Sequence, residues 1–305
     1  MHPTDQAPRP TAAGFALMEL MVATLILLVI AGAMLSGLRR LTQMQNGLSN
    51  RAELYSSVRG AIELMQQEIS QAGSVALPAP VTTTGAVASG GVQAIGVTST
   101  TGMFAGEQII VDTGANAETV TTTGIGTGQL TADFLHAHLA GVPVSVAGGF
   151  ATGLVPTTVT NGSTGSVLKL YGDLNDDGNL MYAEYTCDTA GGNLYRNVMP
   201  FTATSKPAVT ASEAILTNVL PNPSGAPCFA YQQQTVGSNT FVVDVAITLT
   251  VRTQNKDVVT QQYQQETASL LNVSPRNIFD TWEMASLGDT SRVQPMPASV
   301  QALLP

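Results

Sequence analysis

Oxygen-bearing side chains recur at alternate positions in one short, glycine-containing segment of the chain. The segment covers residues 173–184 and reads DLNDDGNLMYAE. Acid or amide side chains at the first, third and fifth places, glycine at the sixth and glutamate at the twelfth form the ligand pattern of a calcium loop. The spacing lets one tight turn supply the oxygens that this hard cation needs. We therefore predict a structural Ca2+ site formed by Asp173, Asn175, Asp177, the carbonyl of Asn179 and a bidentate Glu184.

The setting of this loop is unusual for the pattern. Residues 167–171 and 180–185 alternate as β-strands do, whereas an EF-hand has helices on both sides of its loop. The alternative interpretation is an acidic hairpin turn that binds no specific ligand. Repulsion among Asp173, Asp176 and Asp177 favours a bound cation, and water would replace the oxygen that Met181 lacks at the ninth place.

Two histidines form a weaker candidate. His136 and His138 are two residues apart, so in a strand both imidazoles would lie on one face, with Asp133 nearby. A metal site needs a third ligand of comparable quality. Since none is evident, we interpret both as surface or turn histidines.

A long apolar segment near the N-terminus contains a single charge. Residues 15–38 are apolar or small except for Glu19. A carboxylate in hydrocarbon costs roughly 2.5–3.5 kcal/mol, so it calls for a partner. Cleavage between Gly14 and Phe15 would create an α-amino group able to pair with Glu19 of a neighbouring copy. A plain membrane anchor also fits the length, whereas an ordinary secretory signal has a shorter apolar core.

The residues from Gly14 through Phe15 to Glu19, followed by this apolar segment, resemble the class III signal of type IV prepilins and type II secretion pseudopilins. The resemblance implies that prepilin peptidase cuts after Gly14 and methylates Phe15, and that Glu19 guides assembly. Residues 71–73, 193–196 and 274–277 further resemble PilW-type minor pilins. Major pilins often carry a proline where this chain has Ser36, which also favours a minor pilin or a pseudopilin.

This family resemblance implies a place in the cell. The subunit would cross the bacterial inner membrane once, with its head in the periplasm, and would then enter a pilus or pseudopilus. The positive-inside rule alone favours the opposite orientation, because Arg39 and Arg40 follow the span. In an exported chain we expect Cys187 and Cys228 to pair, stabilising the fold by about 4 kcal/mol; in a cytosolic one they would be separate buried thiols.

Composition disfavours several functions. The chain has 305 residues, 11% of them charged, and a net charge of −9. The balance is acidic and residues 74–168 contain no Lys or Arg, which disfavours binding to nucleic acid. No Ser/His/Asp, Cys/His or phosphate-loop arrangement is present in the sequence, so we expect no enzymatic activity.

The remaining sequence divides into elements that would position these sites. We expect a leader over 1–14, a membrane or filament-core helix over 15–38 and its amphipathic continuation over 39–73. Residues 78–166 predict an inserted β-rich module, and 167–305 a β-sheet head. Strands are predicted at 107–112, 117–122, 167–171, 180–185, 193–198 and 241–252, the last in a hairpin with 258–268. The expected fold is α+β and pilin-like, with a long N-terminal helix packed on an antiparallel sheet.

These expectations lead to one principal hypothesis and two rivals. The first is a minor pilin, a non-catalytic subunit that primes or caps pilus assembly and contacts other pilins through its N-terminal helix. A type II secretion pseudopilin would use the same N-terminus. The third is an adhesin displayed at a filament tip through the module at 78–166.

Overall fold

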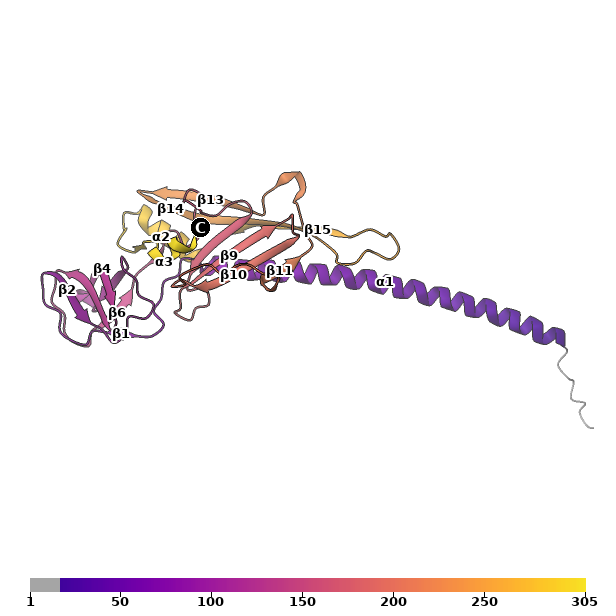
Figure 1. Ribbon diagram of the computed structural model, residues 1–305, viewed down its shortest axis with the longest axis horizontal. Coiled ribbons are helices and arrows are strands. Elements are labelled where there is room, and N and C mark those ends of the chain that lie inside the picture. The colour runs from indigo at the N-terminus through magenta and orange to yellow at the C-terminus, as the bar shows by residue number, and fades with distance from the viewer. Residues whose placement is uncertain (1–16) are drawn as a thin grey trace, which may run out of the picture.

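A single long helix dominates the computed structural model, which describes residues 17–305 (Figure 1). Helix α1 covers Leu17–Gln71 without interruption, about 83 Å at 1.5 Å per residue. No proline breaks it, because the chain has none between Pro10 and Pro78. The helix ends at Gly73, whose positive φ of 80° suits glycine and whose N–H donates to the carbonyl of Tyr171.

The two halves of α1 have different surroundings. Its buried side chains all lie in the C-terminal part: Leu54, Val58, Ala61, Met65, Glu68 and Ile69. Before Leu54 the apolar side chains are exposed, and this includes Leu41, Met44 and Leu48 of the predicted amphipathic stripe. The amphipathic continuation predicted over 39–73 is therefore buried on the head only from Leu54 onward.

Two antiparallel sheets form the head around the C-terminal part of α1. The first has the order β11-β10-β9-β8, and the second contains β12-β14-β13 with β15 on β14. The strands of the first sheet are β8 (Val167–Gly172), β9 (Met181–Asp188), β10 (Asn193–Pro200) and β11 (Ala214–Thr217). Those of the second are β12 (Val219–Leu220), β13 (Phe229–Val236), β14 (Asn239–Arg252) and β15 (Gln265–Val273). The predicted α+β class and long N-terminal helix are confirmed.

The predicted hairpin after β14 is present but its second strand starts late. β15 begins at Gln265, because residues 253–264 form a loop in place of the strand expected from Val258. Asp257 holds this loop, since its carboxylate accepts the N–H groups of Val259 and Thr260 at 2.9 and 2.8 Å.

Short helices complete the head. Helix α2 (Arg276–Ser286) packs against β14, β13 and α1, and helix α3 (Ala298–Leu303) places Val300 and Leu303 in a core cluster. Short 3-10 turns lie at Gly114–Asn116 (η1), Ala211–Glu213 (η2) and Pro223–Gly225 (η3). The main core joins the buried face of α1 to both sheets, so burial of that face holds the helix on the head.

The cysteines form the predicted disulfide. Cys187 on β9 is bonded to Cys228, which immediately precedes β13, with their Cα atoms 6.5 Å apart. The bond links the first sheet to the second. Closing a loop of this length stabilises the fold by about 4 kcal/mol in the chain-entropy model.

A separate sheet with its own core lies beyond the C-terminal end of α1. Its order is β1-β6-β3-β4-β5-β2, and hydrogen bonds of Thr84 to Gly96 and of Thr98 to Thr82 curl it into a half-barrel. We call residues 81–146 the module. Its strands are β1 (Val81–Thr82), β2 (Gly91–Gly96), β3 (Gln108–Val111), β4 (Glu118–Gly126), β5 (Gln129–Phe134) and β6 (Pro143–Val146).

The chain returns from the module to the head well before residue 166. Gly149 and Phe150 form β7, which pairs in parallel with β16 (Val293–Gln294). Gly149 also forms a bridge with Ser74 at the entry to the module. Phe150 and Leu154 lie in cores of the head, so 147–166 is structurally part of the head.

Contacts of Phe104, Gln108 and Gln294 join the module to the head. The Phe104 side chain lies in a core cluster of the head and packs on Phe150, with ring centroids 5.7 Å apart. The buried Gln294 of β16 accepts the Gln108 N–H at 2.9 Å and donates to the carbonyls of Gln108 and Ala147. The carboxyl of Glu107, beside these contacts, is fully buried.

Candidate functional site

The turn between β8 and β9 brings most of the predicted calcium ligands together. Asp173 directly follows β8 and is buried, with one carboxylate oxygen accepting the Asp177 N–H at 3.0 Å and the other the Gly178 N–H at 2.8 Å. Asp177 accepts the Asn179 N–H at 2.9 Å. Asn175, Asp177 and Asn179 are exposed. The turn is therefore folded around Asp173, with oxygen-bearing groups of the other three residues facing solvent.

Glu184 does not belong to this turn, which corrects the predicted twelfth-place ligand. The β8–β9 ladder continues to the pair Gly172↔Met181, so Glu184 lies opposite Lys169, three pairs further along, about 10 Å away. Its carboxylate lies 2.7 Å from Lys206 Nζ and 3.6 Å from Lys169 Nζ. An EF-hand can fold its twelfth residue back because a helix follows; here strand pairing carries the residue away.

The residues fit a cation only in part. Asp173, Asn175, Asp177 and the Asn179 carbonyl share one tight turn, but the bidentate carboxylate expected to complete the shell is occupied by two lysines. No group of three or more His, Cys, Asp or Glu arranged to hold a metal is found among residues 17–305. Water would have to supply the remaining ligands.

The N-terminal site is described only at one of its positions. The predicted leader, which ends at Gly14, and Phe15 both lie outside the described residues. Glu19 is in the first turn of α1, and its side chain is exposed. Within residues 17–305, α1 is the one helix whose length and apolar composition would let it cross a membrane. Such a helix fits a membrane span or a signal anchor.

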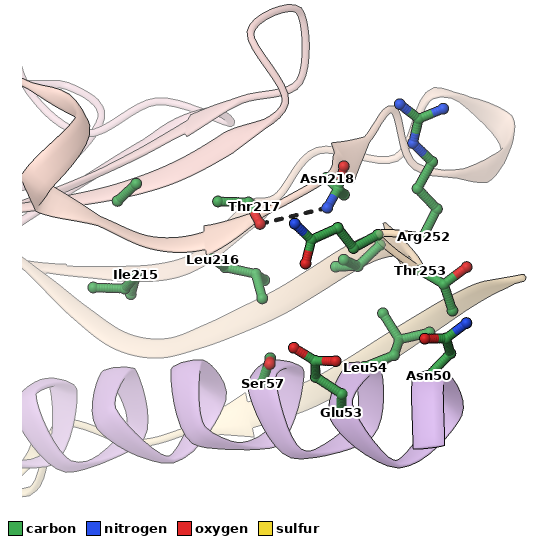
Figure 2. Close-up of a pocket in the computed structure, with 13 residues that line it drawn as sticks. Asn50, Glu53, Leu54, Ser57, Ile215, Leu216, Thr217, Asn218, Arg252 and Thr253 are labelled. Carbon is green, nitrogen blue, oxygen red and sulfur yellow. Dashed lines mark hydrogen bonds between the residues drawn. The ribbon is translucent and has the colours of Figure 1, made fainter. Parts of the chain in front are cut away.

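A small pocket opens where α1 passes between the edges of the two sheets. It has a volume of about 150 Å3 and is lined by residues of α1, β11 and the end of β14. Figure 2 shows Glu53 and Leu54 directed from the helix toward Leu216, while the Arg252 guanidinium points away from the helix. The lining does not bring together a nucleophile, a base and an oxyanion donor, so we assign it no chemistry.

A buried ionic network anchors α1 to the first sheet and was not predicted from the sequence. Glu68 is 3% exposed, and its Oε1 accepts two hydrogen bonds from the Arg196 guanidinium, one of them from Nε at 3.0 Å. The Tyr185 hydroxyl donates to Glu68 Oε2 at 2.5 Å. Burial, reinforced by Glu68, raises the pKa of Tyr185, so the phenol stays protonated and remains a donor.

In the module, His138 is buried between two carboxylates. Its Nε2 lies 2.9 Å from Glu118 Oε2, and its Nδ1 lies 3.4 Å from Asp112 Oδ2. Burial alone would raise the pKa of Glu118, but the N–H groups of Leu135 and His136 and the His138 ring lower it overall. The structure places His136 and Asp133 at the surface. The interpretation of both as surface or turn histidines therefore holds for His136 and is wrong for the buried His138.

Replacing His138 by leucine is expected to lower the free energy of unfolding by about 2–3 kcal/mol, because two neighbouring carboxylates would lose their shared donor. Guanidinium unfolding at pH 7 measures the loss. The matched control is His136→Leu at the exposed position, where a change below about 0.5 kcal/mol is expected. Equal effects of the two substitutions would refute a structural role for His138.

Comparison with protein-family models, with curated proteins and with solved structures finds no match to this chain.

Proposed function

We propose that this protein is a minor pilin, a non-catalytic subunit that is made as a membrane-anchored precursor and assembles into a type IV pilus through α1. The observation that carries the proposal is the division of α1. One uninterrupted helix has an exposed apolar N-terminal part and a C-terminal part buried in an antiparallel head. The exposed part can occupy a bilayer before assembly and pack on the helices of other subunits afterwards.

Two further features support this role. The Cys187–Cys228 disulfide suits a head that folds in an oxidising compartment such as the periplasm. The bilayer disfavours the charge of Glu19, whereas a filament could offer it the α-amino group of a neighbouring subunit. The proposed partners are prepilin peptidase, which would cut after Gly14, and other pilins.

The module favours a second candidate. It lies at the end of the head opposite the exposed half of α1 (Figure 1), and its surface exposes Val92, Leu135 and Leu139. At a filament tip, this end of the subunit would face outward. An adhesin role predicts that removing the module abolishes attachment and leaves piliation intact. A pseudopilin would instead co-purify with secretion components.

The proposed processing is tested by mass analysis of the N-terminus of the mature protein. We expect the chain to begin at N-methylated Phe15, and Gly14→Asp to leave the leader attached and to prevent assembly. A Gly60→Ala substitution, in the part of α1 that lies on the head, is the control, because a Cβ there meets nothing. An intact leader in the unmodified protein, or a cut after residue 30, would refute the proposal.

The proposed calcium site in the β8–β9 turn is tested by thermal unfolding of the protein in detergent. Calcium at about 100 times its dissociation constant stabilises a fold by about 2.7 kcal/mol, so EDTA is expected to lower Tm by several degrees. Asp177→Ala should abolish the EDTA effect, whereas Glu184→Gln should preserve it. An EDTA effect lost with Glu184 and retained without Asp177 would contradict this ligand set.

A further inference from the structure

The loop between β14 and β15 projects beyond the head beside α1, on the side of its exposed half (Figure 1). Its position is fixed by contacts with the helix. Arg51 Nε donates to Gln264 Oε1 at 2.5 Å, and a side chain added at Gly47 would lie 3.1 Å from the Asp257 carboxylate. The loop is thus held at the level of residues 47–51 of α1.

The side chains of this loop combine apolar, aromatic and cationic groups. Val258 and Val259 are 43% and 69% exposed. Arg252 and Lys256 lie over the ring of the exposed Tyr263, at 4.4 and 5.5 Å from its centroid. We call these five residues the loop patch. Exposed aliphatic, aromatic and basic side chains together are typical of surfaces that contact a bilayer interface.

Charge distribution distinguishes this end of the molecule from the rest. Residues 39–56 and 250–266 contain five of the twelve Lys and Arg residues of the chain and only three acids, for a net charge of +2, whereas the whole chain carries −9. The cations are Arg39, Arg40, Arg51, Arg252 and Lys256.

The helix sets the distance of the loop patch from a membrane. If the apolar segment ending at Leu38 spans the bilayer, Gly47 lies about 14 Å beyond its end. The headgroup layer occupies roughly 5–8 Å of that distance. The remaining gap is about one Debye length at physiological ionic strength, and the ordinary tilt of a membrane helix narrows it. Long basic side chains of the loop patch can therefore reach anionic headgroups.

We propose that the loop patch docks on anionic phospholipid headgroups of the leaflet from which α1 emerges, and so fixes the orientation of the head on the membrane before assembly. The inference rests on the membrane span of the proposed function. Lipid is favoured over a second copy of the chain as the occupant, because residues 39–51 of a neighbouring helix, at the level of the loop patch, carry three arginines and no acid to complement these cations.

The test is hydrogen–deuterium exchange of the full-length protein at one subunit per nanodisc, in phosphatidylcholine alone and with 30% phosphatidylglycerol. Residues 253–264 should exchange more slowly in the anionic discs, by about fivefold for each of the two basic residues of the loop patch. Arg252→Gln with Lys256→Gln should return exchange to the rate in phosphatidylcholine, as should high salt. The matched control removes two exposed cations elsewhere, Arg276→Gln with Arg292→Gln, and should preserve the protection.

Two results would overturn the docking alone. The first is equal exchange of residues 253–264 in both lipids. The second is protection that depends on several subunits per disc but not on lipid charge, which would assign the loop patch to contact with a second copy. Exchange of residues 20–36 reports separately on the span. If that segment exchanges as freely as solvent-exposed chain in every disc, α1 is not inserted, and the proposed function fails together with the docking.

Discussion

Replacing Arg196 by methionine is expected to lower the free energy of unfolding by about 3–4 kcal/mol. The substitution keeps much of the aliphatic volume but leaves the buried Glu68 carboxylate with the Tyr185 hydroxyl as its remaining donor among the contacts described here. A buried charge deprived of its ion-pair partner loses Coulomb attraction that had offset its desolvation. The measurement is denaturant unfolding at pH 7, followed by far-UV circular dichroism.

The double variant Glu68→Gln, Arg196→Met separates the charge effect from lost packing. Removing both charges should recover most of the stability, because replacing both partners of a buried pair is much less harmful than removing one. Arg59→Met is the matched control, since Arg59 pairs with Glu63 on the exposed face of the same helix and exposed pairs contribute little. If the double variant is no more stable than Arg196→Met, the loss is one of packing.

The buried Glu107 is expected to make the protein less stable as the pH rises from about 5 to 8. Burial raises the pKa of this carboxyl to about 8, against which the Phe104 N–H has only a small opposing effect. Below the ordinary pKa of glutamate, the folded and unfolded states are both protonated. Between that value and 8 only the unfolded chain releases the proton, so the free energy of unfolding falls with pH. The total loss is about 3–5 kcal/mol at roughly 1.4 kcal/mol per pKa unit.

Glu107→Gln should remove this pH dependence, because the amide has the shape of the protonated carboxyl and does not ionise. The variant is expected to match the unmodified protein near pH 5 and to exceed its stability by several kcal/mol at pH 8. Guanidinium midpoints at four values between these limits measure the divergence. Glu63→Gln, at an exposed position, should run parallel to the unmodified protein. Parallel curves for Glu107→Gln as well would show that the carboxyl is ionised when folded.

The sequence predicted the regular elements well, because each carries a strong local signal. The amphipathic pattern predicted over 39–73 includes Val58, Met65 and Ile69, which lie on the face of α1 that the structure buries. Strict alternation from Phe241 to Arg252 matches β14. Long-range packing was not predictable. The same periodicity extends back to Leu41, and no local signal in the sequence indicates that the head does not cover this part of the helix.

The candidate site residues were predictable where they are close in the sequence. They were not predictable where strand pairing brings distant residues together. Asp173 and Asp177 lie four residues apart and meet in one turn, whereas the position of Glu184 depends on how far the β8–β9 ladder extends. The partners Glu68 and Arg196 are separated by 128 residues, so only the fold brings them together. His138 and Glu118 are 20 residues apart, and their contact was likewise not predictable from the sequence.

The bridge between Ser74 and Gly149 has a consequence for how such a chain can change over evolutionary time. The module leaves and rejoins the head at adjacent residues, so its length can vary without moving the end of α1 or the start of β8. The thermodynamic penalty of a longer or shorter insertion is mainly that of loop closure, which grows slowly with length. The space filled by Phe104 and the hydrogen bonds of Gln294 to Gln108 would need substitutes. The head thus has an insertion point at which a whole domain can be gained, exchanged or deleted in a single genetic event.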